Sequence, residues 1–222
     1  MSRVCAVLVV LSSLSCYARA TTVTVSLPVV DDRSGEDTAD ESQGVLFDGI
    51  FETLFSASDG YLHTFNGIEL EQRSAIEFSM MDLHDEGAIV HAELKLHVAG
   101  RTVQPLDLLL LGYAGDGIVL PADFGASRLI ESRVLDDTPS NLDLTYDVTA
   151  LLTELRNVNA THAGFAFQVS HGATLLLASQ ETRLGDQFRP ELHATYAVVP
   201  EPSSIAICLI SVGAIALVCK VS

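Results

Sequence analysis

Cysteine, tryptophan and positive charge are scarce in this chain of 222 residues. Tryptophan is absent, and the four cysteines lie near the two ends, at positions 5, 16, 208 and 219. The long middle of the chain therefore has neither a disulfide framework nor a cysteine-based metal site. The cysteines at the ends stand in apolar runs, where they act as small apolar residues.

Basic residues are few, with 12 Lys and Arg against 29 Asp and Glu, and the formal net charge is −17. All 29 acids lie between residues 21 and 201, and three bases lie outside that stretch, which leaves nine bases and a formal charge of −20 there. Such a stretch repels phosphate groups, which excludes nucleic acid as a partner. Cations and neutral ligands such as sugars remain compatible with it.

The short motifs of common enzymes are also absent: the chain has no G-x-S-x-G, H-E-x-x-H, P-loop or G-x-G-x-x-G pattern. His91 and His97 share a face of a predicted strand, but at 3.3 Å per residue they lie about 20 Å apart, too far to share a metal. We interpret His91 and Glu93 as part of a solvated sheet face. The sequence predicts a protein that is not an enzyme and has no cofactor.

Weaker candidates for binding stay open. Loop oxygens in residues 82–87 or 115–117 could hold Ca²⁺, although both stretches are more typical of turns. Sugar rings stack on aromatic side chains, and Tyr61, Tyr113 and Phe124 are the candidate platforms, although packing in a core is the commoner role for each.

The first 20 residues have the three parts of a secretory signal peptide. Arg3 supplies a positive start, residues 4–14 are apolar, and Ala18 and Ala20 form an A-x-A cleavage signal. We expect export through the Sec translocon and cleavage after Ala20.

The chain ends with a second apolar run, residues 203–219, which has no charge and precedes Lys220. As a helix it would be about 25 Å long, near the lower limit for a transmembrane span. The positive-inside rule then predicts Lys220 in the cytoplasm and the acidic domain outside.

A Pro-Glu-Pro motif, Pro200, Glu201 and Pro202, comes directly before this run. Proline fixes its backbone angle and lacks an amide hydrogen, so the motif stays extended and outside the helix. The order of motif, apolar helix and terminal base resembles the PEP-CTERM sorting signal of exported bacterial proteins, although that family usually ends in several arginines. The resemblance implies processing by an exosortase, with an inner-membrane precursor and a final place at the cell surface or in the extracellular matrix.

Between these ends, residues 21–198 alternate apolar and polar side chains with the period of β-strands. The clearest case is 89–98, where Val90, Ala92 and every second residue onward point one way. Further strands are expected at 21–27, 107–113, 142–148, 163–170, 173–179 and 191–196. Residues 149–157 have leucines at helical spacing, with Thr149 as the expected cap. The pattern predicts an all-β antiparallel sandwich with one short helix.

The acidic stretch 31–44 has no large apolar residue between its first position and Gly44, and we expect a loop or linker there.

The back half has a "DVT" leading into the short helix, a "GFAF" strand, an "ASQE" strand end and a closing "RPELHATY" strand. This order resembles the DNRLRE-type jelly-roll domain, which is related to carbohydrate-binding modules, over about residues 47–196. The matching residues are Asp147, Val148, Thr149, Ser179, Glu181, Arg189, Pro190, Leu192 and Tyr196. The resemblance implies a jelly-roll sandwich that can bind glycans. Asp147 and Thr149 are expected to cap the helix, and Glu181 and Arg189 to pair across a turn.

We expect a non-enzymatic exported surface or matrix protein. The alternative is a carbohydrate-binding module for an envelope or environmental polysaccharide, and a glycan-active enzyme is the least favoured hypothesis.

Overall fold

The structure, a computed structural model, describes residues 21–38, 53–57, 59–67, 70–83, 87–102, 105–125, 128–136 and 141–198. Residues 22–197 form one compact unit. The other unit combines residues 1–21 and 198–222, of which only Thr21 and Val198 are described. The fold is therefore that of residues 22–197 with the two strand ends that adjoin them.

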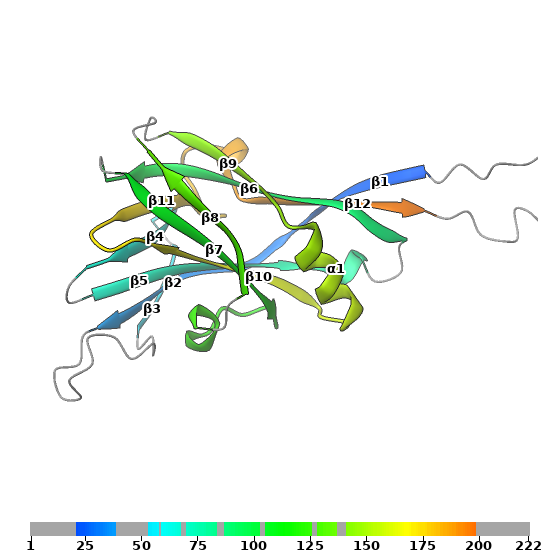
Figure 1. The fold of residues 1–222 in the computed structure, drawn as a ribbon, viewed down its shortest axis with the longest axis horizontal. Coiled ribbons are helices and arrows are strands. Elements are labelled where there is room, and N and C mark those ends of the chain that lie inside the picture. The colour runs from blue at the N-terminus through cyan, green and yellow to red at the C-terminus, as the bar shows by residue number, and fades with distance from the viewer. Residues whose placement is uncertain are drawn as a thin grey trace, which may run out of the picture. The chain divides into compact units, whose positions relative to one another are not determined.

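Twelve strands and one α-helix make up the described part of the chain (Figure 1). The strands are β1 Thr21–Leu27, β2 Val29–Thr38, β3 Thr53–Ser56, β4 Tyr61–Asn66, β5 Leu70–Ser79, β6 Ala88–Arg101, β7 Leu106–Gly115, β8 Arg128–Leu135, β9 Leu142–Asp147, β10 His162–Val169, β11 Thr174–Ala178 and β12 Glu191–Val198. The helix α1 is Thr149–Asn157, and three 3₁₀ turns are η1 Met81–Leu83, η2 Pro121–Phe124 and η3 Asp186–Phe188. The predicted all-β class with one short helix is confirmed.

The strands form two sets that pack as a sandwich. One set runs β3-β2-β5-β10-β7-β8, and the other joins β1, β12, β6, β9 and β11 around the long strand β6. The strand β4 links the sets because it pairs with β11 along its length and with β5 at its last two residues. The pairings among β2 to β12 are antiparallel. The two sets also meet at β8 and β9, where the Arg133 side chain of β8 donates to the Thr145 backbone carbonyl of β9 at 3.0 Å and stacks on the Tyr146 ring.

The core lies between the two sets and is built from the apolar positions of the alternating strands. Phe78 of β5 and Phe165 of β10 meet edge to face with ring centroids 5.9 Å apart, and both are fully buried. The predicted alternation of β6 is confirmed at Ala92, Leu94 and the following alternate positions, which are buried. Val90, by contrast, is 50% exposed, because it lies near the end of β6 where the apolar face is incompletely covered.

The predicted acidic loop over 31–44 is wrong for residues 31–38, which belong to β2. This strand pairs with β5 along almost its whole length and with β3 on its other side. The strand lacks an alternating apolar pattern because acidic residues, whose carboxylates accept hydrogen bonds from loop amides, stand where apolar residues would otherwise lie. Asp31 accepts a hydrogen bond from Val119 N at 2.9 Å, and Asp32 accepts one from Gln180 N at 2.7 Å. Residues 39–44 lie outside the described part of the chain.

The predicted helix is confirmed as α1, next to β6 and β10 (Figure 1). Leu151 and two further leucines form its buried face. The N-cap position is held by Val148, which has no side-chain cap, and Asp147 before it accepts the Thr149 backbone N–H at 2.9 Å. Thr149 is the first helical residue rather than the cap, and its hydroxyl instead accepts a hydrogen bond from Ala92 N at 2.8 Å. This bond ties the start of the helix to β6.

Candidate functional site

A pocket of about 330 Å³ lies beside β2, β3, β4 and β5. The residues that line it are Ser34, Phe55, Ser56, Asp59, His63 and Gln72. Strand pairing brings them together, because Ser34 of β2 lies opposite Phe55 of β3 on one side and opposite Ser74 of β5 on the other. We call this the Phe55 pocket.

One wall of the Phe55 pocket depends on two buried serines. The strand β4 pairs with β5 only at its last two residues, so residues 61–64 of β4 have no backbone pairing with β5. The His63 backbone N–H donates to Ser34 Oγ at 2.8 Å, and the His63 carbonyl accepts from Ser74 Oγ at 2.9 Å. Thr64 Oγ1 completes this group at 2.5 Å from Ser74 Oγ. The serine hydroxyls thus replace the missing backbone partners and fix where the His63 side chain emerges.

The polar end of the pocket is a carboxylate and imidazole pair. His63 Nε2 lies 2.8 Å from Asp59 Oδ2, and Asp59 Oδ1 accepts the Tyr61 backbone N–H at 3.1 Å. Partial burial acts to raise the pKa of Asp59, but the hydrogen bonds from His63 and Tyr61 outweigh it and hold that pKa below its usual value. The carboxylate is therefore ionised at neutral pH and is held in a fixed direction.

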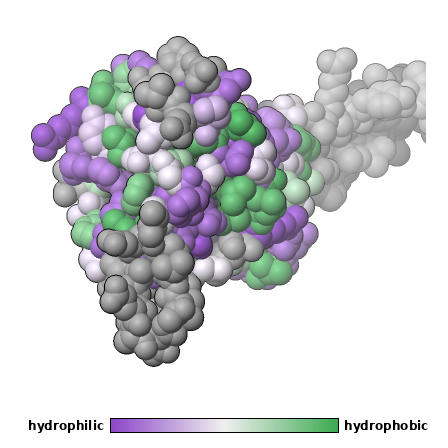
Figure 2. Space-filling model, turned by 60° about the vertical axis from the view of Figure 1, so that its left-hand side comes forward, coloured by the Kyte–Doolittle hydropathy of each residue, from purple (hydrophilic) through white to green (hydrophobic). Residues whose placement is uncertain are grey.

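The apolar end is Phe55, whose side chain is 42% exposed although it lies in a strand. Gln72 adds an amide, which also donates to Glu36 Oε2 at 3.0 Å. An exposed ring beside a few fixed polar groups is the composition of sites that bind small polar ligands with an apolar face. Across the face seen in Figure 2, hydrophilic and hydrophobic residues are intermixed.

Among the described lining residues of this pocket, Asp59 is the one carboxylate. Glycoside hydrolysis by the usual routes needs two carboxyl groups, one on each side of the bond to be cleaved. The described lining therefore offers groups that can hold a ligand, with one carboxylate where these routes use two.

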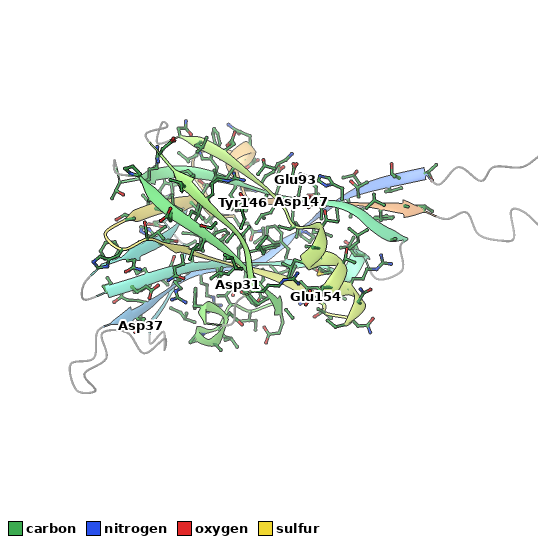
Figure 3. The ribbon with its side chains drawn as sticks, viewed as in Figure 1. Asp31, Asp37, Glu93, Tyr146, Asp147 and Glu154 are labelled. Carbon is green, nitrogen blue, oxygen red and sulfur yellow. The ribbon has the colours of Figure 1, made fainter. Side chains whose placement is uncertain are left out.

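The outer face of β6 carries His91 and Glu93, which were predicted to lie on a solvated face, and Lys95 after them. Glu93 lies opposite Asp147 of β9 (Figure 3) and, on its other side, opposite His193 of β12. His91 Nε2 is 4.0 Å from Glu93 Oε2. The interpretation of these side chains as a solvated polar face agrees with their exposure.

His97, expected on the same wet face, is instead 4% exposed. The turn η3 covers it, with the Phe188 ring centroid 4.2 Å from the His97 ring centroid. The His97 Nδ1 atom lies 2.6 Å from Asp143 Oδ1. Sequence spacing placed His97 correctly in the strand, but the covering turn comes from residues 186–188, far along the chain, and could not be foreseen from alternation.

The candidate Ca²⁺ stretch 115–117 begins a loop whose amides are bound by carboxylates. Four consecutive N–H groups, those of residues 117–120, each donate a hydrogen bond to a carboxylate. The acceptors, in that order, are Glu77, Asp116, Asp31 and Asp123, at 2.6, 3.1, 2.9 and 2.7 Å. These carboxylates hold the loop against the sheet. In the described part of the chain, no group of three His, Cys, Asp or Glu side chains has the geometry to hold a metal ion.

Glu77 is the deepest of these acceptors. Glu77 is fully buried, and this burial raises the pKa of its carboxyl group. The nearby carboxylates Asp123 and Asp116 raise that pKa further, while the hydrogen bond from Gly117 acts to lower it. Glu77 lies in one cross-strand row with Gly164 and Tyr113. The Tyr113 ring crosses Gly164, where a Cβ atom would lie 2.2 Å from the ring.

Two of the three candidate aromatic platforms are core residues. Tyr113 and Phe124 are 7% and 0% exposed and pack together with Val119 on the covered side of β5, β7 and β10. The third, Tyr61, is partly buried at the start of β4 and is not among the lining residues of the Phe55 pocket. The exposed ring at this pocket is Phe55, which the sequence pattern did not single out. The expected Glu181–Arg189 pair is replaced by a contact of Arg189 with Asp186 at 2.9 Å.

The predicted targeting residues lie outside the described part of the chain: Ala18, Ala20, Pro200, Glu201, Pro202 and Lys220. The same holds for the apolar run 203–219. Within the described residues, no helix has both the length and the apolar character needed to cross a membrane.

Comparison with known proteins identifies no family. No family model matches the chain, and no curated protein matches it. Among solved structures, the match to the infectious bursal disease virus Gx strain structure covers 85% of this chain and 44% of the viral chain, at 10% identity and a TM-score of 0.22. The match to the T13 particle of the same virus covers 81% of this chain and 36% of the viral chain, at 11% identity and a TM-score of 0.21. The chain spans less than half the length of either, and similarities this low carry no argument about its function.

Proposed function

We propose that the chain is an exported, non-enzymatic surface protein whose β-sandwich binds a neutral saccharide in the Phe55 pocket. The observation that carries the binding proposal is the pairing of an exposed ring, Phe55, with a fixed carboxylate, Asp59, in one pocket of about 330 Å³.

A saccharide matches both ends of the pocket. Its C–H face can lie on the Phe55 ring, and its hydroxyls can donate to the ionised Asp59 and exchange hydrogen bonds with the Gln72 amide. The single carboxylate of the lining favours binding over hydrolysis. The formal charge of −17 favours a neutral ligand over a polyanion. A jelly-roll arrangement, implied by the DNRLRE resemblance of the sequence, is consistent with such a role.

Surface export rests on the two ends of the sequence. The signal peptide with Ala18 and Ala20 directs the chain to the Sec translocon, and the tail with Pro200, Glu201 and Pro202 directs it to an exosortase at the membrane. The precursor is anchored in the inner membrane through residues 203–219, and the processed protein is placed at the cell surface or in the matrix.

A glycan array tests the binding proposal. The full chain, its Phe55→Ala variant and the control Val134→Ala, which trims a more exposed apolar residue on β8, are applied with and without Ca²⁺. We expect wild type and the control to bind the same polysaccharides and Phe55→Ala to bind them at least about tenfold more weakly, a loss of about 1.4 kcal/mol. No binding by the wild type, or equal binding by Phe55→Ala, contradicts the proposal.

Cell fractionation tests the sorting proposal separately. Replacing Glu201 by Ala is expected to leave the protein in the inner membrane with its tail intact, whereas the wild type reaches the surface. If both proteins fractionate alike and mass spectrometry shows the tail retained in both, the sorting proposal is wrong.

A further inference from the structure

The edges of the sandwich are not equally protected. Among the described strands, β1, β3, β8 and β9 have a strand partner on one side only. Natural sheets guard such edges with short strands or charged side chains. Here β3 has four residues, β8 carries Arg128, Glu131 and Arg133, and β9 carries Asp143 and Asp147. The strand β1 has seven residues and no charge, so it is the one unguarded edge among these four.

The composition of β1 suits pairing with another strand. Its sequence TTVTVSL begins with five consecutive β-branched residues and contains neither proline nor glycine. Val23 is 39% exposed, and the first four residues are exposed throughout. On its paired side, Thr24 Oγ1 lies 2.8 Å from Thr195 Oγ1 of β12, which helps to hold β1 in place. The backbone groups on its other side are therefore presented in a fixed row.

The outer end of β1 has uncharged neighbours, which is unusual for so acidic a chain, whereas Thr24 in the middle of the strand lines a pocket with His91, Glu93 and Lys95. The ends of the three adjoining strands, residues 21–27, 194–198 and 88–90, contain no charged side chain. Two copies of a chain with a formal charge of −17 repel one another over most of their surfaces. The neutral end of β1 is a place where two copies can approach without bringing acids together.

We propose that β1 is a self-association edge, at which β1 of one copy pairs antiparallel with β1 of a second copy about a two-fold axis. Such a contact is isologous, so the same uncharged strand supplies both sides and the edge is closed by a single partner. It joins the two sheets into one across the contact. The contact is independent of the Phe55 pocket, which is built from β2, β3, β4 and β5.

The test compares the full chain in detergent micelles with two lysine variants. Thr22→Lys places a charge on β1, and Ser132→Lys places the same charge on an exposed position of β8, which already has charges. We measure the protein mass by analytical ultracentrifugation and the amide hydrogen exchange of residues 21–27. We expect a dimer with protected β1 amides for the wild type and Ser132→Lys, and fast exchange with a monomer mass for Thr22→Lys.

Far-UV circular dichroism confirms that each variant is folded, and Thr22 is exposed, so its replacement leaves the core intact. Unchanged β1 exchange in Thr22→Lys, or a monomeric wild type, overturns the proposal even if the apolar tail associates in the micelle. Protection of β1 that appears only after another protein is added also overturns it, because the partner is then not a second copy.

Discussion

Replacement of Ser34 by Ala tests how the wall of the Phe55 pocket is held. Ser34 is 3% exposed, and its hydroxyl accepts the His63 backbone N–H at 2.8 Å where β4 has left the β5 ladder. Alanine leaves that N–H without its acceptor in a part-buried position. An unsatisfied buried donor costs about 1–3 kcal/mol, so we expect a loss of about 2 kcal/mol in the free energy of unfolding.

Urea denaturation followed by circular dichroism measures this loss. With a slope of about 2 kcal/mol per molar urea, the midpoint should fall by about 1 M, with the slope itself unchanged. The control Ser132→Ala, on the exposed side of β8, should shift the free energy by no more than about 0.5 kcal/mol. A Ser34→Ala midpoint equal to that of the control would refute the reasoning, because the hydroxyl would then not be replacing a backbone partner.

Two further predictions concern the cross-strand row of Glu77, Gly164 and Tyr113. The pKa of Glu77 is raised above the unfolded value of 4.5, so its stabilising contribution is present below pH 4.5 and is lost as the pH rises through the folded pKa. The wild type should therefore lose free energy of unfolding relative to Glu77→Gln over that pH rise. A difference in unfolding free energy that stays constant with pH contradicts this. Gly164→Ala places a Cβ 2.2 Å from the Tyr113 ring and should cost about 1–3 kcal/mol by overpacking, measured by thermal unfolding; an unchanged melting temperature contradicts it.

The strands that the sequence made visible are those in which one face is apolar along the whole strand. In β12 the buried positions are alternate apolar residues, and the same holds in β6 apart from His97, which η3 covers, so period two predicts both the strand and the face. The helix α1 was equally visible, because its three leucines recur at helical spacing and all three are buried.

The strands β2 and β5 were missed because their polar residues are buried. In β2, Asp31 and Asp32 are acceptors for loop amides, and in β5, Glu77 lies beneath the loop of η2. An interpretation based on apolar alternation treats such residues as solvent-facing, and so it assigned the acids of β2 to a loop. The loops that cover them come from distant parts of the chain, residues 117–120 and Gln180.

The Phe55 pocket was missed for the same reason. Its residues are spread over positions 34 to 72, the part of the chain with the weakest alternation, and they meet only through strand pairing. A weak signal existed in YLHTFN, residues 61–66, where Leu62 and Thr64 are buried and His63 is half-exposed on the other face. That alternation predicts a strand, but it does not show that Asp59 and Phe55 lie beside His63.

The most direct test of the binding proposal follows the histidine ring signals by NMR while a saccharide selected on the array is added to the full chain in micelles. We expect the His63 signals to shift in a saturable manner with the ligand, because His63 lines the pocket, and the signals of His193 on the outer face of β12 to stay unchanged. Saturable binding that leaves His63 unchanged would show that the saccharide binds elsewhere and would contradict the assignment of the Phe55 pocket.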